Sequence, residues 1–198
     1  MINNFELIKP LLDFPTPLSF YHVQILKRRK DNPDMLRDME VIEQYAIWDH
    51  NDFIFKYADI MATCIKYNAR AYINLNVRDQ KKVALVTMNL ISTYILNEDY
   101  KAVKNAFWRA CGTTNSQTPK RWIVDIDTKD ESILIKYIDL INTSPIGRKI
   151  IAIIPTVNGK HIISEPFNVK EFRESRIPAY DTEFVDIHKD HPTILYVP

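Results

Sequence analysis

The sequence predicts an α+β protein, because two kinds of hydrophobic periodicity alternate along its 198 residues. Some segments alternate apolar and polar residues, which is typical of strands with one buried face. Others place apolar residues three and four positions apart, which is typical of amphipathic helices. The continuously apolar run at 150–154 indicates a central strand that is buried on both faces.

The first half of the chain is predicted to mix strands and helices. Three segments have the strand period: 19–28, 41–47 and 70–76. Three others have the helical period: 52–67, a segment from Val83 to Tyr94, and a segment from Tyr100 to Ala110. Gly112 stands where a helix C-terminal cap is expected. The charged segment 29–40 and the polar segment 113–120 are predicted to be loops.

The second half is predicted to contain six elements in the order β-α-β-β-α-β. They are a strand at 122–127, a helix opened by the capping box Thr128–Glu131, strands at 150–154 and 160–164, a helix near 168–175 and a strand at 183–188. Asn158-Gly159 indicates the hairpin turn between the middle strands, and 193–197 is expected to be an edge strand. This order is a split βαβ arrangement of the ferredoxin-like or RRM-like type. We therefore expect an α/β module over 1–118, packed on an RRM-like half over 119–198.

The shortage of glycine excludes two common ways of binding nucleotides. The chain has only three glycines, Gly112, Gly147 and Gly159. Neither a GxxxxGK[ST] phosphate loop nor a GxGxxG dinucleotide fingerprint can be written with them. A phosphate site in this protein must therefore use side chains and metal.

Charge and cysteine content restrict the remaining possibilities. The net charge is +1, so nucleic-acid binding would need a local basic patch. Cys64 and Cys111 lie in apolar surroundings and are expected to be buried free thiols. No signal peptide or membrane span is expected from the sequence. These features favour the cytoplasm, or the host cytoplasm if the protein is phage-encoded.

Two pairs of residues with strand spacing are the main candidates for chemistry. Asp125 and Asp127 are two positions apart on a predicted strand, so both carboxylates project from one face. Such a pair suits Mg²⁺ or Mn²⁺, which prefer oxygen ligands, although it could also mark the end of a strand. Asp186 and His188 form a second such pair, which could complete a metal site or form a solvated face.

Basic residues near aromatic residues are candidates for contacts with phosphates and bases. Lys160 and His161 lie at the predicted hairpin, where they could reach an anionic ligand or simply be exposed. Arg70 shares a strand face with Tyr72, and Arg121 precedes Trp122. The basic run at 27–30 is interpreted as a solvated strand end.

The order of three short motifs resembles the archaeo-eukaryotic primase superfamily, also called the primase-polymerases. The family pattern hDhD corresponds to Val124-Asp125-Ile126-Asp127, s-x-H to Gly159-Lys160-His161, and hD to Val185-Asp186. The chain is similar in particular to small phage-type proteins. The resemblance covers 121–197 well and 1–120 only loosely.

The resemblance implies a nucleotidyltransferase with an RRM-like catalytic core. Asp125, Asp127 and Asp186 would be catalytic and hold Mg²⁺ or Mn²⁺, and His161 would contact the phosphates of the incoming nucleotide. From their positions, we add Lys160, Arg70 and Arg121 as nucleotide-binding residues. The expected partners are single-stranded DNA, nucleoside triphosphates and replication proteins. Two alternatives remain open: an RRM-like module that binds nucleic acid or a replication partner without catalysis, and a metal-dependent nuclease.

Overall fold

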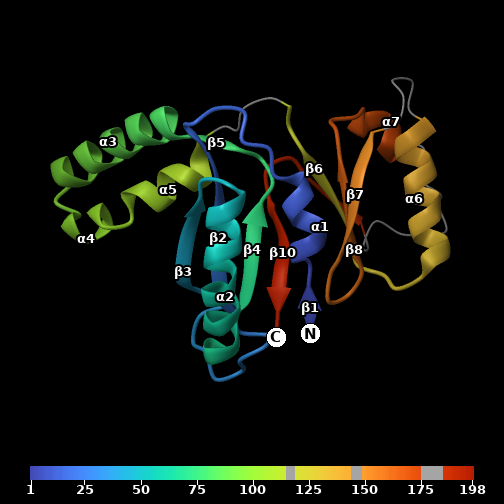
Figure 1. The fold of residues 1–198 in the computed structure, drawn as a ribbon, viewed down its shortest axis with the longest axis horizontal. Helices are drawn as coiled ribbons and strands as arrows, with labels where there is room; N and C mark the ends of the chain where they lie inside the picture. Colours follow the sequence, from blue (N-terminus) through green and yellow to red (C-terminus); the bar gives the residue numbers. More distant parts are fainter. Residues whose placement is uncertain (115–118, 144–148, 175–184) are drawn as a thin grey trace.

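The protein has an α+β fold with two antiparallel sheets, in agreement with the predicted class (Figure 1). The computed structural model describes residues 1–114, 119–143, 149–174 and 185–198. Gly147, positions 183–184 of a predicted strand, and parts of the predicted 113–120 loop and 168–175 helix lie outside these ranges. None of the described helices has the length and apolar character that a membrane span requires.

The first sheet combines strands from both ends of the chain. Its strands, in spatial order, are β1 (Ile2–Asn3), β10 (Pro192–Val197), β4 (Arg70–Asn74), β2 (Ser19–Arg28) and β3 (Met39–Ile47), and β5 (Arg78–Asp79) pairs with β2. The strand predicted at 193–197 was expected at an edge, but β10 lies between β1 and β4. Leu195 and Tyr196 are both buried, because this strand is covered on both faces.

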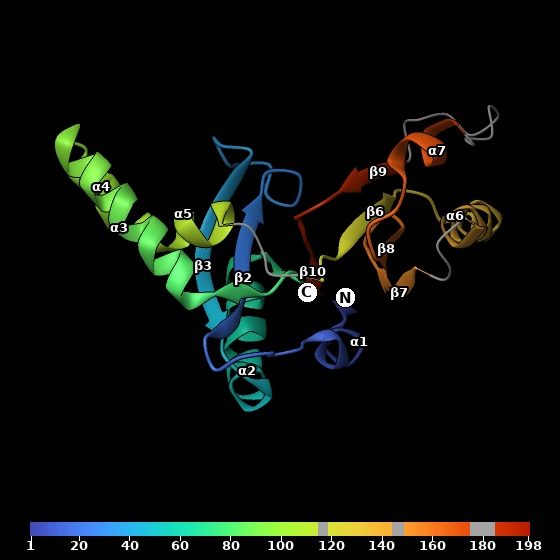
Figure 2. The same cartoon turned by 90° about the horizontal axis from the view of Figure 1, so that it is seen from above.

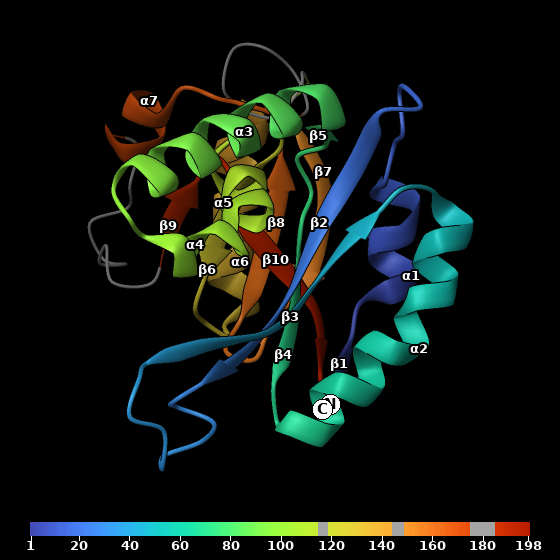
Figure 3. The same ribbon diagram turned by 90° about the vertical axis from the view of Figure 1, so that its left-hand side faces the viewer.

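One face of the first sheet is covered by α1 (Phe5–Ile8), the short helix η1 (Lys9–Leu11) and α2 (His50–Tyr67) (Figure 3). Asp49 begins α2 by accepting a hydrogen bond from the Asp52 amide at 2.8 Å. The apolar face expected from positions 54, 57, 58, 61, 64 and 65 is only partly the buried one. Packing against the sheet buries the stripe Phe53, Tyr57, Ile60 and Cys64 and leaves Ile54 and Ile65 exposed.

The opposite face of the first sheet carries α3 (Gln80–Leu96), α4 (Tyr100–Val103) and α5 (Ala106–Thr113). The helix predicted from Tyr100 to Ala110 is divided here into α4 and α5. Gly112 lies inside α5, whose C-cap is Thr114, so its predicted capping role was wrong. Both cysteines are buried and free as predicted, and burial raises the pKa of each thiol to about 12.

The second sheet is formed by β7 (Ile150–Pro155), β8 (Lys160–Ser164), β6 (Trp122–Ile126) and β9 (Val185–His188), in that spatial order. The hairpin predicted at Asn158-Gly159 joins β7 and β8. β7 was expected to be a central strand, but among the described strands it pairs with β8 alone, and it leaves Ile151 exposed. Its apolar run therefore reflects the β-propensity of isoleucine in part, and not burial alone.

Helices α6 (Glu131–Thr143) and α7 (Val169–Glu174) cover the outer face of the second sheet (Figure 2). The predicted capping box at Thr128 is replaced by Asp130, whose Oδ1 accepts a hydrogen bond from the Ser132 amide at 2.9 Å. On the inner face, Ile123, Ile154 and Ile163 join the core of the first sheet. The two sheets therefore pack through one shared core, and polar residues of both face each other beside it.

Candidate functional site

Strand β6 separates apolar and acidic side chains by simple alternation. Val124 and Ile126 are fully buried in the core beneath α6. Asp125 projects from the opposite face, and Asp127 follows directly after the strand. Both aspartates line a cleft of about 340 Å³ between the two sheets. This arrangement agrees with the expected division of β6 into a core face and an acidic face.

Strand register brings the three motif segments together. Asp125 is directly opposite His161 on β8 and directly opposite Asp186 on β9. Directly opposite residues of antiparallel strands have side chains on the same face, with Cβ atoms about 4.5–5.5 Å apart. The three residues therefore form one row across the face of the sheet that looks toward the first sheet.

His161 is held from both sides. Its Nδ1 lies 2.8 Å from Oγ1 of Thr193 on β10, and its Nε2 lies 3.3 Å from Oδ1 of Asp125. Burial by itself raises the pKa of the Asp125 carboxyl, but the hydrogen bond and charge of His161, with His188 and Lys30 beyond, outweigh burial and hold this pKa below its usual range. Thr193 was missed by the sequence analysis, because no motif marks it and it comes from the other sheet.

Asp186 is in register with Asp125, but its carboxylate points toward His188. Its side chain is 74% exposed, Oδ2 lies 3.6 Å from Nε2 of His188, and Oδ1 accepts a hydrogen bond from the Ile187 amide. His188 lines the cleft and stacks on His191, with ring centroids 4.3 Å apart. Asp186 itself is not among the residues that line the cleft. Within the described ranges, no three His, Cys, Asp or Glu side chains are grouped closely enough to hold a metal ion.

The wall opposite the acidic row is basic and comes from the first sheet. Arg28, Lys30, Arg70 and Tyr72 line it. Arg28 donates a hydrogen bond to the Tyr72 hydroxyl at 3.1 Å, and Arg70 donates one to Asp31 at 2.5 Å. Burial lowers the pKa of Lys30, and the charges of Arg28 and Arg70 lower it further. The basic run at 27–30, interpreted from the sequence as a solvated strand end, thus supplies part of a cleft wall.

Gly159 sets how closely the hairpin approaches the acidic strand. A Cβ atom at this position would lie 1.8 Å from the Ile126 carbonyl oxygen and 2.8 Å from the Thr128 amide nitrogen. These two atoms flank Asp127. The preceding residues Thr156, Val157 and Asn158 line the cleft. Only glycine lets this turn lie against the end of β6 without displacing one of them.

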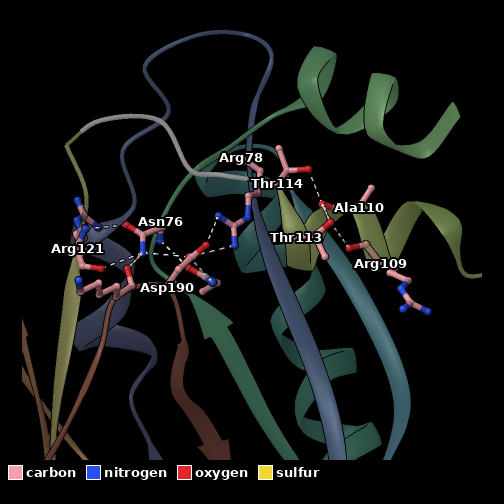
Figure 4. Close-up of polar contacts among 10 residues, drawn as sticks. Asn76, Arg78, Arg109, Ala110, Thr113, Thr114, Arg121 and Asp190 are labelled. Atoms are coloured by element: carbon pink, nitrogen blue, oxygen red, sulfur yellow. Dashed lines mark hydrogen bonds and ion pairs between the residues drawn. The ribbon is translucent and has the colours of Figure 1, made fainter. Parts of the chain in front are cut away.

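Two predicted nucleotide-binding residues lie outside the cleft. Lys160 projects from the other face of β8 and pairs with Glu131 of α6 at 2.6 Å. The side chain of Arg121 donates a hydrogen bond to the carbonyl of Leu11. The backbone of Arg121 exchanges two hydrogen bonds with the Asn76 side chain (Figure 4). Arg70 and His161 are the members of the predicted binding set that line the cleft.

A buried polar network supports the segment between β9 and β10. Arg78, 1% exposed, donates two hydrogen bonds of 3.1 Å to the Asp190 carboxylate, to which Asn74 and Asn76 also donate (Figure 4). Because Asp190 lies between His188 and His191, this network holds the histidine side of the cleft against the first sheet. Asn76 also binds Arg121 at the start of β6, so one amide side chain joins three segments.

Comparisons with protein-family models, with curated proteins and with solved structures give no match to this chain.

Proposed function

We propose that the protein is a primase-like nucleotidyltransferase that uses divalent cations and acts on a single-stranded DNA template. The proposal depends on one observation. Asp125, Asp127 and His161 face Arg28, Lys30 and Arg70 across the cleft, and Asp186 is the neighbour of Asp125 in strand register. Extension of a strand requires carboxylates for metal on one side of a triphosphate and cations for its phosphates on the other.

Asp125, Asp127 and Asp186 are the residues that would hold the cations. Asp125 Oδ1 is buried and lies 3.3 Å from His161 Nε2, so a bound cation would share this carboxylate with the imidazole. The exposed Asp186 carboxylate can turn from His188 toward Asp125 by rotation about its own side-chain bonds, because their Cβ atoms are neighbours. Bound Mg²⁺ or Mn²⁺ would neutralise phosphate charge and acidify the 3′-hydroxyl.

The protein's own side chains would bind and orient the triphosphate. Arg28 and Arg70 offer planar guanidinium groups that suit phosphate oxygens, and Lys30 adds a point charge. His161, fixed by Thr193, would present Nε2 to the same site. The strand order β7-β8-β6-β9 agrees with the proposed RRM-like split βαβ core, in which the first and third strands of the unit are central.

A second groove supports a single-stranded template as partner. Gln24 of β2 is directly opposite Tyr72, which lines the cleft, and Gln24 donates a hydrogen bond to Gln44 of β3 at 2.9 Å. Beyond them lies a groove of about 670 Å³, lined by side chains that suit bases and phosphates: Gln24, Gln44, Trp108, Lys104 and Arg109, together with Glu43 and others. An aromatic ring beside amide and cationic groups suits a single strand. The template would thus run from the cleft across the first sheet.

Nucleotide incorporation on a labelled DNA template, with NTPs or dNTPs and Mg²⁺ or Mn²⁺, tests the proposal. We expect extended products, and we expect Asp125→Asn and Asp127→Asn to reduce the rate by at least about a hundredfold, because each removes several kcal/mol of transition-state stabilisation. Asp59→Asn, on the exposed side of α2, is the matched control and should leave the rate unchanged.

The same assay separates the two alternatives. Shortened strands would indicate a nuclease. No product, together with metal-independent and salt-sensitive binding of the oligonucleotide, would indicate a binding module. The pairing of Asp186 with His188 also favours a binding module, because it turns the Asp186 carboxylate away from the proposed metal site. Equal extension by the wild type and by Asp125→Asn would exclude the proposed site.

A further inference from the structure

Helix α3 exposes an apolar stripe along its whole length. Leu85, Met88, Ile95 and Leu96 are between 50% and 83% exposed. Ser92 continues the stripe, and its hydroxyl is bonded to the Met88 carbonyl of the same helix. These positions recur every three or four residues and therefore lie on one side of the helix.

The stripe lies opposite the side of α3 that packs on the protein. Val83 is fully buried, and Val86 and Leu90 pack with it against Phe107 and Trp108 of α5. The contacts that hold α3 on the rest of the protein come from this buried side of the helix. The exposed leucine, methionine and isoleucine side chains thus form an apolar surface beyond what the folded chain uses.

Opposite charges stand at the two ends of the stripe. Lys81 and Lys82 are exposed at its N-terminal end, and Glu98 and Asp99 are exposed at its C-terminal end. The pattern is symmetric about position 90: position 81 corresponds to 99, 85 to 95, and 88 to 92. An antiparallel copy of the same helix would therefore meet opposite charge at both ends, apolar residues along the length, and a serine opposite each methionine.

We propose that α3 is the interface through which two copies of this chain form a symmetric dimer, with their α3 helices antiparallel. A two-fold axis makes the patch complementary to itself, as an isologous interface requires. The antiparallel arrangement also opposes the two helix dipoles favourably. In Figure 2, α3 and α4 lie at the far side of the first sheet from the second sheet, so pairing through α3 leaves the cleft of each copy open.

Sedimentation equilibrium of the full chain tests the dimer. We expect the wild type to have twice the chain mass at micromolar concentrations. We expect Met88→Glu to be a monomer, because its dimer would bury one carboxylate from each copy at the centre of the interface. Phe55→Glu on α2 is the matched control, since Phe55 is 78% exposed but belongs to another surface. It should remain dimeric. Far-UV circular dichroism of both variants should match the wild type, which shows that each variant still folds.

Charge exchange then tests the antiparallel orientation. The double variants Lys81→Glu/Lys82→Glu and Glu98→Lys/Asp99→Lys should each raise the dissociation constant at least tenfold. Mixing the two should give a heterodimer tighter than either homodimer, since one partner then has acidic groups at both ends and the other has basic groups.

Three results would overturn the proposal: a wild type that stays monomeric to 0.5 mM, a Met88→Glu variant that stays dimeric, or no recovery on mixing the charge variants. None of them depends on catalysis, so the proposed activity is tested separately.

Discussion

Asp125 on β6 and His161 on β8 lie directly opposite each other, with Oδ1 of the carboxylate 3.3 Å from Nε2 of the imidazole. Thr193 completes the contact from the other sheet, 2.8 Å from Nδ1. When the imidazole is neutral, the carboxylate favours the proton on Nε2, and Nδ1 then accepts the Thr193 hydroxyl hydrogen. One threonine thereby orients the residue that faces the acidic cleft.

Thr193→Val should loosen this orientation while keeping the volume of the side chain. We expect the ¹⁵N chemical shifts of His161 to change from one dominant tautomer to a mixture, and nucleotide incorporation to fall by about tenfold, as for other residues that orient a functional histidine. Thr87→Val, on α3, removes a hydroxyl that donates to the Val83 carbonyl of the same helix and is the control. Unchanged His161 shifts in Thr193→Val would contradict the positioning role.

The two described glycines should respond in opposite ways to alanine. Gly159→Ala places a methyl group against the Ile126 carbonyl oxygen, so we expect a loss of stability of about 1–3 kcal/mol and displacement of Asp127. Gly112→Ala has no atom within 4 Å of its new Cβ and lies in α5, so it should gain up to about 1 kcal/mol. Urea unfolding of both variants measures the contrast. Equal stabilities would show that the hairpin yields to the added methyl group.

The pair Arg78–Asp190, whose guanidinium is buried and whose carboxylate is 35% exposed, should contribute more than a fully exposed pair. Arg78→Met leaves the partly exposed Asp190 carboxylate without its guanidinium partner, so we expect a loss of about 1–3 kcal/mol. A double-mutant cycle with Asp190→Leu should give a large coupling energy. The same cycle on Arg29 and Asp38, which are 58% and 94% exposed, should give less than about 1 kcal/mol. Equal coupling in the two cycles would argue against the structural role of the buried network.

Stability should fall in mild acid because of His22. Burial lowers the pKa of His22 from its ordinary 6.5 to about 4. The hydrogen bond with Gln44 raises this pKa but does not offset the effect of burial. The unfolded chain therefore binds a proton that the folded chain excludes, so stability is complete above pH 6.5 and is lost as the pH falls toward 4, by on the order of 3 kcal/mol.

His22→Gln removes this titration, so its free energy of unfolding should change less between pH 7 and pH 4.5 than that of the wild type. Urea unfolding at the two pH values measures the difference. His50→Gln, at an exposed position, should behave as the wild type. If the His22→Gln protein lost as much stability as the wild type, another group would be responsible.

Local periodicity was sufficient for most elements. Alternation predicted β2, β4 and β6, and Asn158-Gly159 predicted the β7–β8 hairpin, because each depends on neighbouring residues alone. The same reasoning failed where a segment has two apolar faces and tertiary packing determines which of them is buried. α2 has apolar residues on two adjacent stripes, and only the sheet determines which one is buried.

By itself, the sequence determined the α+β class, the two-residue spacing that puts Asp125 and Asp127 on one face, and the order of the acidic and histidine motifs. Tertiary structure alone decided the register that sets Asp125 between His161 and Asp186, the placement of β10 with Thr193 in the first sheet, and the basic wall opposite the carboxylates. The reason is physical. Spacing along a strand follows from covalent geometry, whereas the contacts across the cleft join residues about a hundred positions apart through the burial of a shared core.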